Sequence, residues 1–137
     1  MVLKKRILNS MAYHNELGKW GEEYATKYLQ DKGYIIMERD WRYGRSKHDI
    51  DIICKTADRT TVVFVEVKTR SHEEVVAPEF AVNRRKIRNI GQAADNYVKM
   101  NNIVEYLRFD IITIIGQEGS CNIKLNHMVD AFNPMLV

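Results

Sequence analysis

The sequence predicts a single α/β domain in which one sheet is flanked by helices, and three observations lead to this prediction. Segments 15–31 and 78–100 carry apolar residues at three- and four-residue spacing, as amphipathic helices do. The segments between and after them are short, apolar and rich in β-branched residues, which is typical of strands. A length of 137 residues suits one domain with a buried core. We therefore expect the order helix, three strands, helix, two strands.

Each predicted element has a recognisable boundary. The first helix ends at Gly33, a typical helix stop, and a strand is expected over 34–41. A second strand begins near His48, and the turn-forming segment TADRT, 56–60, separates it from a third over 61–69 in what resembles a hairpin. The last strands are expected around 106–115 and 121–129. The domain then covers 14–133, with a mobile tail over 1–13 and a C-terminal tail over 134–137.

Composition excludes several classes of protein. An apolar fraction of 45% with 28% charged residues is that of a globular chain, and no apolar run is long enough for a membrane span or a secretion signal. A net charge of +3 is too small to indicate nucleic-acid binding by itself. Cys54 and Cys121 each lie in a predicted strand, which favours buried reduced thiols. We expect a cytoplasmic protein that does not contact membranes.

The segment VFVEVKTR, 63–70, places two charged residues within a strand that is otherwise apolar. Strand alternation puts Glu66 and Lys68 on the same face. A buried charge is costly unless it is paired or bound to a metal. Two interpretations remain open at this point: an internal ion pair beside a solvated sheet edge, or a catalytic site.

The preceding strand supplies a second pair of acidic residues, Asp49 and Asp51, which also share a face. If the hairpin is centred between Asp58 and Arg59, Asp51 lies directly opposite Glu66. Opposed residues have Cβ atoms about 5 Å apart, and two carboxylates at that distance repel each other unless a cation lies between them. Mg²⁺ suits such a pair, because it takes one or two carboxylates, keeps several waters and binds substrate phosphate. Lysine can then orient or deprotonate the attacking water.

Glu22, in the first helix, is the candidate fourth member of this site. It lies at the border of the apolar face, whereas Glu23 points to the polar side. A solvated helix carboxylate is the alternative, and periodicity alone favours it. Gly18 and Gly21 each cost about 1 kcal/mol relative to alanine in a helix, so a close approach of helix to sheet is the expected compensation.

The motifs together resemble the YraN-like family of bacterial proteins, placed in the PD-(D/E)XK nuclease superfamily beside archaeal Holliday-junction resolvases. The resemblance covers roughly 14–133 and rests on GKWGEEYATKYLQDKGY, HDIDII, VFVEVKTR, RFDII and DAF. It implies a restriction-endonuclease-like αβββαβ core around a mixed sheet of about five strands. It also implies catalytic positions at Glu22, Asp51, Glu66 and Lys68. Ile50 replaces the superfamily's proline, and Asp49 replaces the family's usual glutamate.

Basic residues flank the predicted site and could bind nucleic-acid phosphates, although charge runs are often only solvated. The residues predicted to bind nucleic acid are Arg42, Arg45, Lys47, Arg70, Arg84, Arg85, Lys86 and Arg88.

Three hypotheses for function follow from the sequence. The leading one is an endonuclease that uses Mg²⁺, or Mn²⁺ in its place, to cut DNA, including branched or flapped DNA, with Asp51 and Glu66 as metal ligands. The second is a nucleic-acid-binding module on the same fold, without turnover or dependent on a partner. The third is a protein-interaction scaffold. Whether two chains pair as a homodimer stays open.

Overall fold

The fold was analysed in a computed structural model that describes residues 2–46, 48–73 and 82–136. The elements are α1 (Val2–Asp31), β1 (Ile35–Arg42), β2 (Asp49–Lys55), β3 (Thr61–Arg70), α2 (Arg84–Asn101), β4 (Tyr106–Ile115), β5 (Lys124–Met128) and the short 3₁₀ helix η2 (Pro134–Leu136). This order confirms the predicted αβββαβ core.

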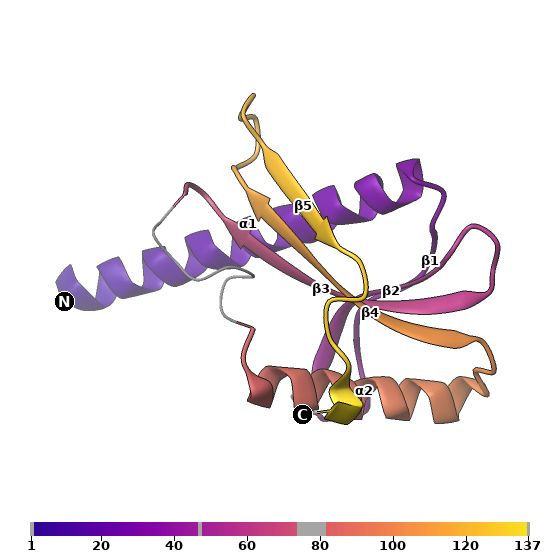
Figure 1. The fold of residues 1–137 in the computed structure, drawn as a ribbon. Helices are drawn as coiled ribbons and strands as arrows, with labels where there is room; N and C mark the ends of the chain where they lie inside the picture. The colour runs from indigo at the N-terminus through magenta and orange to yellow at the C-terminus, as the bar shows by residue number, and fades with distance from the viewer. Residues whose placement is uncertain (1, 47, 74–81, 137) are drawn as a thin grey trace.

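The five strands form one mixed sheet in the order β1-β2-β3-β4-β5. Neighbouring strands are antiparallel except for β3 and β4, which are parallel and are joined through α2. The sheet lies between α1 and α2, and each helix covers one face (Figure 1). The restriction-endonuclease-like arrangement expected from the sequence is therefore present.

Each face of the sheet has its own apolar core. On the α1 side, Ala25 and Leu29 pack against residues of β2, β3 and β4, including Val65 and Ile112, all of which are buried. On the α2 side, Tyr97 packs against a second buried cluster that includes Phe64. The strands that carry the acidic residues are thus covered on both faces, which keeps their positions well defined.

The β2–β3 hairpin has the predicted turn. Asp58 accepts hydrogen bonds from the Thr56 hydroxyl at 2.7 Å and from the Thr60 amide at 3.1 Å, which closes the turn. Arg59 takes the left-handed conformation that the turn needs, with φ of 64°. The turn therefore sets the register of the whole hairpin.

Two expectations about the ends of elements are wrong. The first helix begins at Val2, not near residue 15, so residues 2–13 are helical; their side chains are exposed, and the N-terminal end of α1 projects beyond the sheet (Figure 1). Mobility of this segment stays a prediction. Cys121 is exposed and precedes β5, because the turn between β4 and β5 extends to residue 123. Cys54 is buried in β2, as expected.

Candidate active site

The acidic residues of β2 and β3 meet where these two strands separate. The β2–β3 ladder pairs Lys55 with Val62 and ends with Ile52 opposite Val65. This is the register predicted from the turn, and its continuation by one residue places Asp51 opposite Glu66. Beyond this point β3 continues beside β4, and no other strand of the described residues pairs with its second edge.

Asp51 occupies the point of separation. Its Oδ2 accepts a hydrogen bond of 2.8 Å from the Val67 amide, a group that would otherwise bond to a neighbouring strand. The side chain is 9% exposed, and that of Glu66 is 5% exposed. Each of the two carboxyl groups shifts the pKa of the other, so they lie close together. The predicted convergence of Asp51 and Glu66 is therefore present.

Glu22 reaches this pair from α1. Its side chain is half-buried and shares a hydrogen bond with Asp51, whereas Glu23 is exposed. The approach depends on Gly21, since a Cβ at this position would lie 1.9 Å from the Thr69 hydroxyl of β3. The predicted role of Gly21 in close packing is confirmed. That of Gly18 is wrong, because no atom lies within 4 Å of its would-be Cβ.

Burial and mutual repulsion make the acidic residues poor acids. Burial, followed by the charge of Asp51, raises the pKa of Glu66 from 4.5 to about 8. The same two causes raise the pKa of Glu22 to about 7. Burial also raises the pKa of Asp51, although the Val67 amide opposes the shift. Three carboxyl groups that resist ionisation in one place form a site that a cation would stabilise.

Two lysines lie on either side of Glu66. Lys68 Nζ lies 3.8 Å from Oε1 of Glu66, and Lys86 Nζ lies 3.8 Å from Oε2. The internal Glu66–Lys68 ion pair, which the sequence left as an alternative to a catalytic site, is thus present together with the carboxylate cluster. Their charges lower the pKa of Glu66 without cancelling the effect of burial.

The sequence did not predict that Lys86 contacts the acidic residues of the site. The sequence indicated only a phosphate-binding role within a basic run, but the structure places Lys86 between Glu66 and Asp49, whose Oδ1 lies 3.9 Å away. Lys86 stands in the first turn of α2, where its amide is capped by Asn83 at 2.9 Å. This turn therefore directs the lysine toward β2 and β3.

The other predicted phosphate-binding residues surround the site without forming one cluster. Arg42 lies 3.9 Å from Oδ2 of Asp49, so this carboxylate links the end of β1 to α2. Arg70 lies two residues beyond Lys68 in β3. The exposed members are Arg42 at the end of β1, Arg45 in the loop after it, and Arg84, Arg85 and Arg88 on α2. Lys47 lies outside the described residues.

The donor set fits a hard divalent cation. Asp51 and Glu66 offer carboxylate oxygens, which Mg²⁺ prefers, and Mg²⁺ needs only one or two of them. Among the described residues, no group of three or more His, Cys, Asp or Glu side chains is arranged to hold a metal ion. Asp51 contacts both glutamates, but the geometry supports a two-carboxylate site and not a closed protein cage.

The fold together with these residues defines a PD-(D/E)XK-type nuclease-like protein. Residues 21–114 match the uncharacterised protein family UPF0102, and the chain belongs to this family, the YraN-like family expected from its motifs.

Bacterial relatives match nearly the whole chain. The UPF0102 protein of Bacteroides thetaiotaomicron is 46% identical over 92% of this chain and 99% of the relative. Those of Syntrophomonas wolfei and Porphyromonas gingivalis are 42% and 41% identical, over 87% and 93% of this chain and 99% and 90% of the relatives.

Among solved structures, SfsA of Pyrococcus furiosus in complex with Ca²⁺ is similar with a TM-score of 0.39 and 18% identity. The match covers 82% of this chain and 62% of SfsA. In the described part of this chain, no helix is both long and apolar enough to cross a membrane.

Proposed function

We propose that the protein is a cytoplasmic endonuclease that uses Mg²⁺ to hydrolyse phosphodiester bonds in DNA, with branched or structured DNA as its substrate. The observation that carries this proposal is the meeting of the Asp51 and Glu66 carboxyl groups beside Lys68. Mn²⁺ should substitute for Mg²⁺, because it accepts the same oxygen ligands.

We assign the residues their roles in this proposal from their positions. Asp51 and Glu66 would hold the metal, which would neutralise phosphate charge and make a bound water more acidic. Lys68, 3.8 Å from Glu66, is placed to orient the attacking water and to stabilise charge on the phosphorane. Glu22 supports the position and protonation of Asp51 through their shared hydrogen bond. Lys86 would hold Glu66 and Asp49 in place from the opposite side.

The basic residues around the site would bind the sugar–phosphate backbone. Arg45, Arg84, Arg85 and Arg88 are exposed on the loop after β1 and on the first turns of α2. Such contacts are independent of sequence and weaken with salt, so affinity should fall steeply as ionic strength rises. Substrate shape would then be the main determinant of where the protein cuts. Two copies of the chain could each address one strand of a branched substrate, and the sedimentation of the complex measures this stoichiometry.

Cleavage of labelled flapped, branched and single-stranded DNA in Mg²⁺ or Mn²⁺ tests the proposal. Glu66→Gln and Lys68→Ala should each lower the cleavage rate by about 10²–10⁴-fold, since each removes a group acting on the reacting atoms. Glu23→Gln is the matched control, because Glu23 is an exposed glutamate of α1 and its loss should leave the rate unchanged.

The outcomes separate the competing hypotheses. Equal cleavage by the wild type, Glu66→Gln and Lys68→Ala would identify a contaminating nuclease and would remove the support for catalysis. Salt-dependent binding without cleavage would favour the nucleic-acid-binding module. Absence of salt-dependent binding to any DNA would contradict both and favour a protein-interaction scaffold.

A further inference from the structure

Both oxygens of the Glu66 carboxylate face an ammonium group. Lys68 Nζ lies 3.8 Å from Oε1, and Lys86 Nζ lies 3.8 Å from Oε2. Glu66 is also one of the two carboxylates proposed to bind the metal. A divalent cation that binds either oxygen must therefore approach a positive charge, and like charges repel each other more strongly in a buried site than in water. The affinity of the site for metal thus depends on whether an ammonium group can move away.

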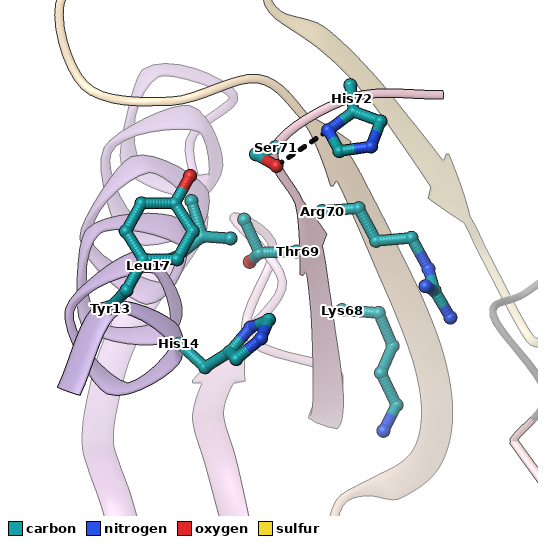
Figure 2. Close-up of a pocket in the computed structure, with 8 residues that line it drawn as sticks. All are labelled: Tyr13, His14, Leu17, Lys68, Thr69, Arg70, Ser71 and His72. Carbon is teal, nitrogen blue, oxygen red and sulfur yellow. Dashed lines mark hydrogen bonds between the residues drawn. The ribbon is translucent and has the colours of Figure 1, made fainter. Parts of the chain in front are cut away.

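The two lysines are held in different ways. Lys68 belongs to the same strand as Glu66, and its side chain extends from β3 away from Tyr13 and Leu17 of α1 (Figure 2). Lys86 comes from the first turn of α2, the helix on the opposite side of the sheet from α1 (Figure 1). The backbone of β3 fixes Lys68 two residues from Glu66, on the same face of the strand. The position of Lys86 depends instead on the packing of α2 against the sheet.

Lys86 has a second carboxylate within reach. Its Nζ lies 3.9 Å from Oδ1 of Asp49, nearly the same distance as from Glu66. Arg42 approaches the other oxygen of Asp49, Oδ2, at 3.9 Å, so Oδ1 is the oxygen that faces Lys86. The side chain of Asp49 is 25% exposed and that of Lys86 is 34% exposed, against 5% for Glu66. A small movement of the amine toward Asp49 would therefore free Oε2 of Glu66 and keep the charge of Lys86 paired.

The electrostatics of the site support a special position of Lys86. Burial raises the pKa of Asp51 and that of Glu66, and the charge of Lys86 lowers both. On Glu66 the charge of Lys86 has a larger effect than that of Lys68. The amine of Lys86 therefore stabilises the ionised forms of the same two carboxylates that a metal would bind, as a competing cation does.

We propose that Lys86 competes with the divalent metal for Glu66 and moves to Asp49 when the metal binds. The inference rests on the proposed nuclease function and deepens it, because it describes how metal binding to the same site is regulated. Lys86 weakens metal binding, and Asp49 limits this loss of affinity by accepting the displaced amine. Lys86 is thus a positioning residue that also sets the metal affinity of the site.

Calorimetric titration with Mn²⁺ in the absence of nucleic acid tests this competition independently of cleavage. Lys86→Met keeps most of the apolar stem of the side chain and removes its charge, so it should bind Mn²⁺ about tenfold more tightly than the wild type. Lys99→Met is the matched control, since Lys99 is an exposed lysine near the other end of the same helix, paired with Asp95. It should bind Mn²⁺ within about twofold of the wild type.

A double-mutant cycle separates competition by Lys86 from a general effect of charge. Asp49→Asn should weaken Mn²⁺ binding in the wild type, because Lys86 loses the carboxylate to which it moves. The same change should weaken binding much less in Lys86→Met, where no amine has to be displaced. In Lys68→Met, Asp49→Asn should weaken binding as much as in the wild type, since the ion pairs of Asp49 are made with Arg42 and Lys86.

Thermal denaturation gives a second measure of metal binding in the same proteins. Saturating Mn²⁺ should raise the Tm of Lys86→Met by more than it raises the Tm of the wild type, because tighter binding to the folded state stabilises it more. A cooperative transition also shows that the variant is folded. Lys86→Gln, which removes the same charge, should give the same pattern and replaces Lys86→Met if the methionine disturbs packing.

The outcomes distinguish this inference from the proposed function. Mn²⁺ affinity that is unchanged or lower in Lys86→Met would overturn the competition and leave the proposed metal site standing. Equal effects of Asp49→Asn in the wild type, Lys86→Met and Lys68→Met would also overturn it, because they would indicate general electrostatics without a movement of Lys86. If neither the wild type nor Lys86→Met bound Mn²⁺, this inference and the proposed metal-dependent function would both fail.

Discussion

Two buried acidic regions in this protein are stabilised in opposite ways. Asp110, in β4, is completely buried and accepts hydrogen bonds from Arg108 at 2.9 and 2.8 Å, from the Asp130 amide at 3.0 Å, and contacts His127 at 2.7 Å. Although burial opposes it, these partners lower the pKa of Asp110. The cluster of Asp51 and Glu66 is almost as buried, yet burial raises the pKa of both residues; the charge of Asp51 raises that of Glu66 further, and the charge of Asp49 raises that of Asp51.

The difference separates a structural charge from a functional one. The Asp110 network extends to Tyr34, which accepts from Arg108 at 2.8 Å, and to Tyr28 of α1, so it ties the helix to the sheet. Its charges are compensated within the protein. The Asp51–Glu66 cluster has lysines only at 3.8 Å or beyond, and its carboxyl groups resist ionisation, so a further cation would stabilise their charged forms. Carboxylates in such an environment are typical of functional sites.

The largest expected effect is on the structural network. Asp110→Asn should lower the free energy of unfolding by about 3–5 kcal/mol, because it leaves Arg108 half-buried without its counter-charge. Urea denaturation at pH 7 measures this loss. A loss of less than about 1 kcal/mol would mean that the charge of Asp110 contributes little to stability, and it would contradict the structural role given to this region.

Removing a charge from the functional cluster should increase the stability of the protein, in contrast to the loss expected for Asp110→Asn. At pH 8 without metal, Glu66→Gln should raise the free energy of unfolding by about 1–3 kcal/mol. The pKa of Glu66 is about 8 in the folded protein, against the ordinary value of 4.5 in the unfolded chain. Between these two pH values only the folded protein keeps the proton on Glu66. Wild-type stability should therefore fall as pH rises from 4.5 to 8, and the gain of the variant should vanish below pH 4.5.

The Asp110 network should respond to pH in the other direction. Because its pKa is lowered, its contribution is present above the ordinary value of 3.8 and is lost as pH falls below it. Urea denaturation across pH 3–8 measures the pH dependence of stability that each of the two regions contributes. A wild-type stability that rose steadily up to pH 8 would contradict the raised pKa of Glu66.

The close approach of α1 is tested by two glycines of the same helix. Gly21→Ala should destabilise the protein by about 1–3 kcal/mol, because the added methyl would collide with Thr69. Gly18→Ala meets no atom within 4 Å and should stabilise it by about 0.5–1 kcal/mol. Thermal denaturation compares the two, and equal effects would mean that α1 does not pack closely at Gly21.

The smallest expected effect tests whether Glu22 contributes to the function of the cluster. Glu22→Gln should lower the cleavage rate about tenfold, since it alters the proton shared with Asp51. Glu23→Gln, one residue along and exposed, should leave the rate unchanged. Initial rates on flapped DNA measure the difference. A matching loss in both variants would indicate a general electrostatic effect of α1.

The sequence was sufficient for the features that local chemistry determines. The turn at Asp58 and the alternation of the two strands were enough to predict the register that brings Asp51 to Glu66. Periodicity alone favoured a solvated carboxylate for Glu22, whereas the glycines of the first helix and the resemblance both pointed to its approach to the acidic strands; its catalytic role stays a prediction.

What could not be predicted depends on contacts between distant segments. Lys86 is 20 residues from Glu66 along the chain, and only the packing of α2 against the sheet brings its amine to the carboxylate. Cys121 was misplaced because a polar turn and a short edge strand have similar composition. The Asp110 network likewise joins three separate elements, α1, β4 and β5. Such arrangements follow from tertiary packing, which overrides local preference.

Calorimetric titration of the protein with Mn²⁺ tests the central claim most directly. The account predicts that the wild type binds Mn²⁺ at a site formed by Asp51 and Glu66, and that Asp51→Asn weakens this binding at least about tenfold. Glu23→Gln should bind as the wild type does. Unchanged Mn²⁺ affinity in Asp51→Asn would contradict the assignment of these carboxylates as a metal site.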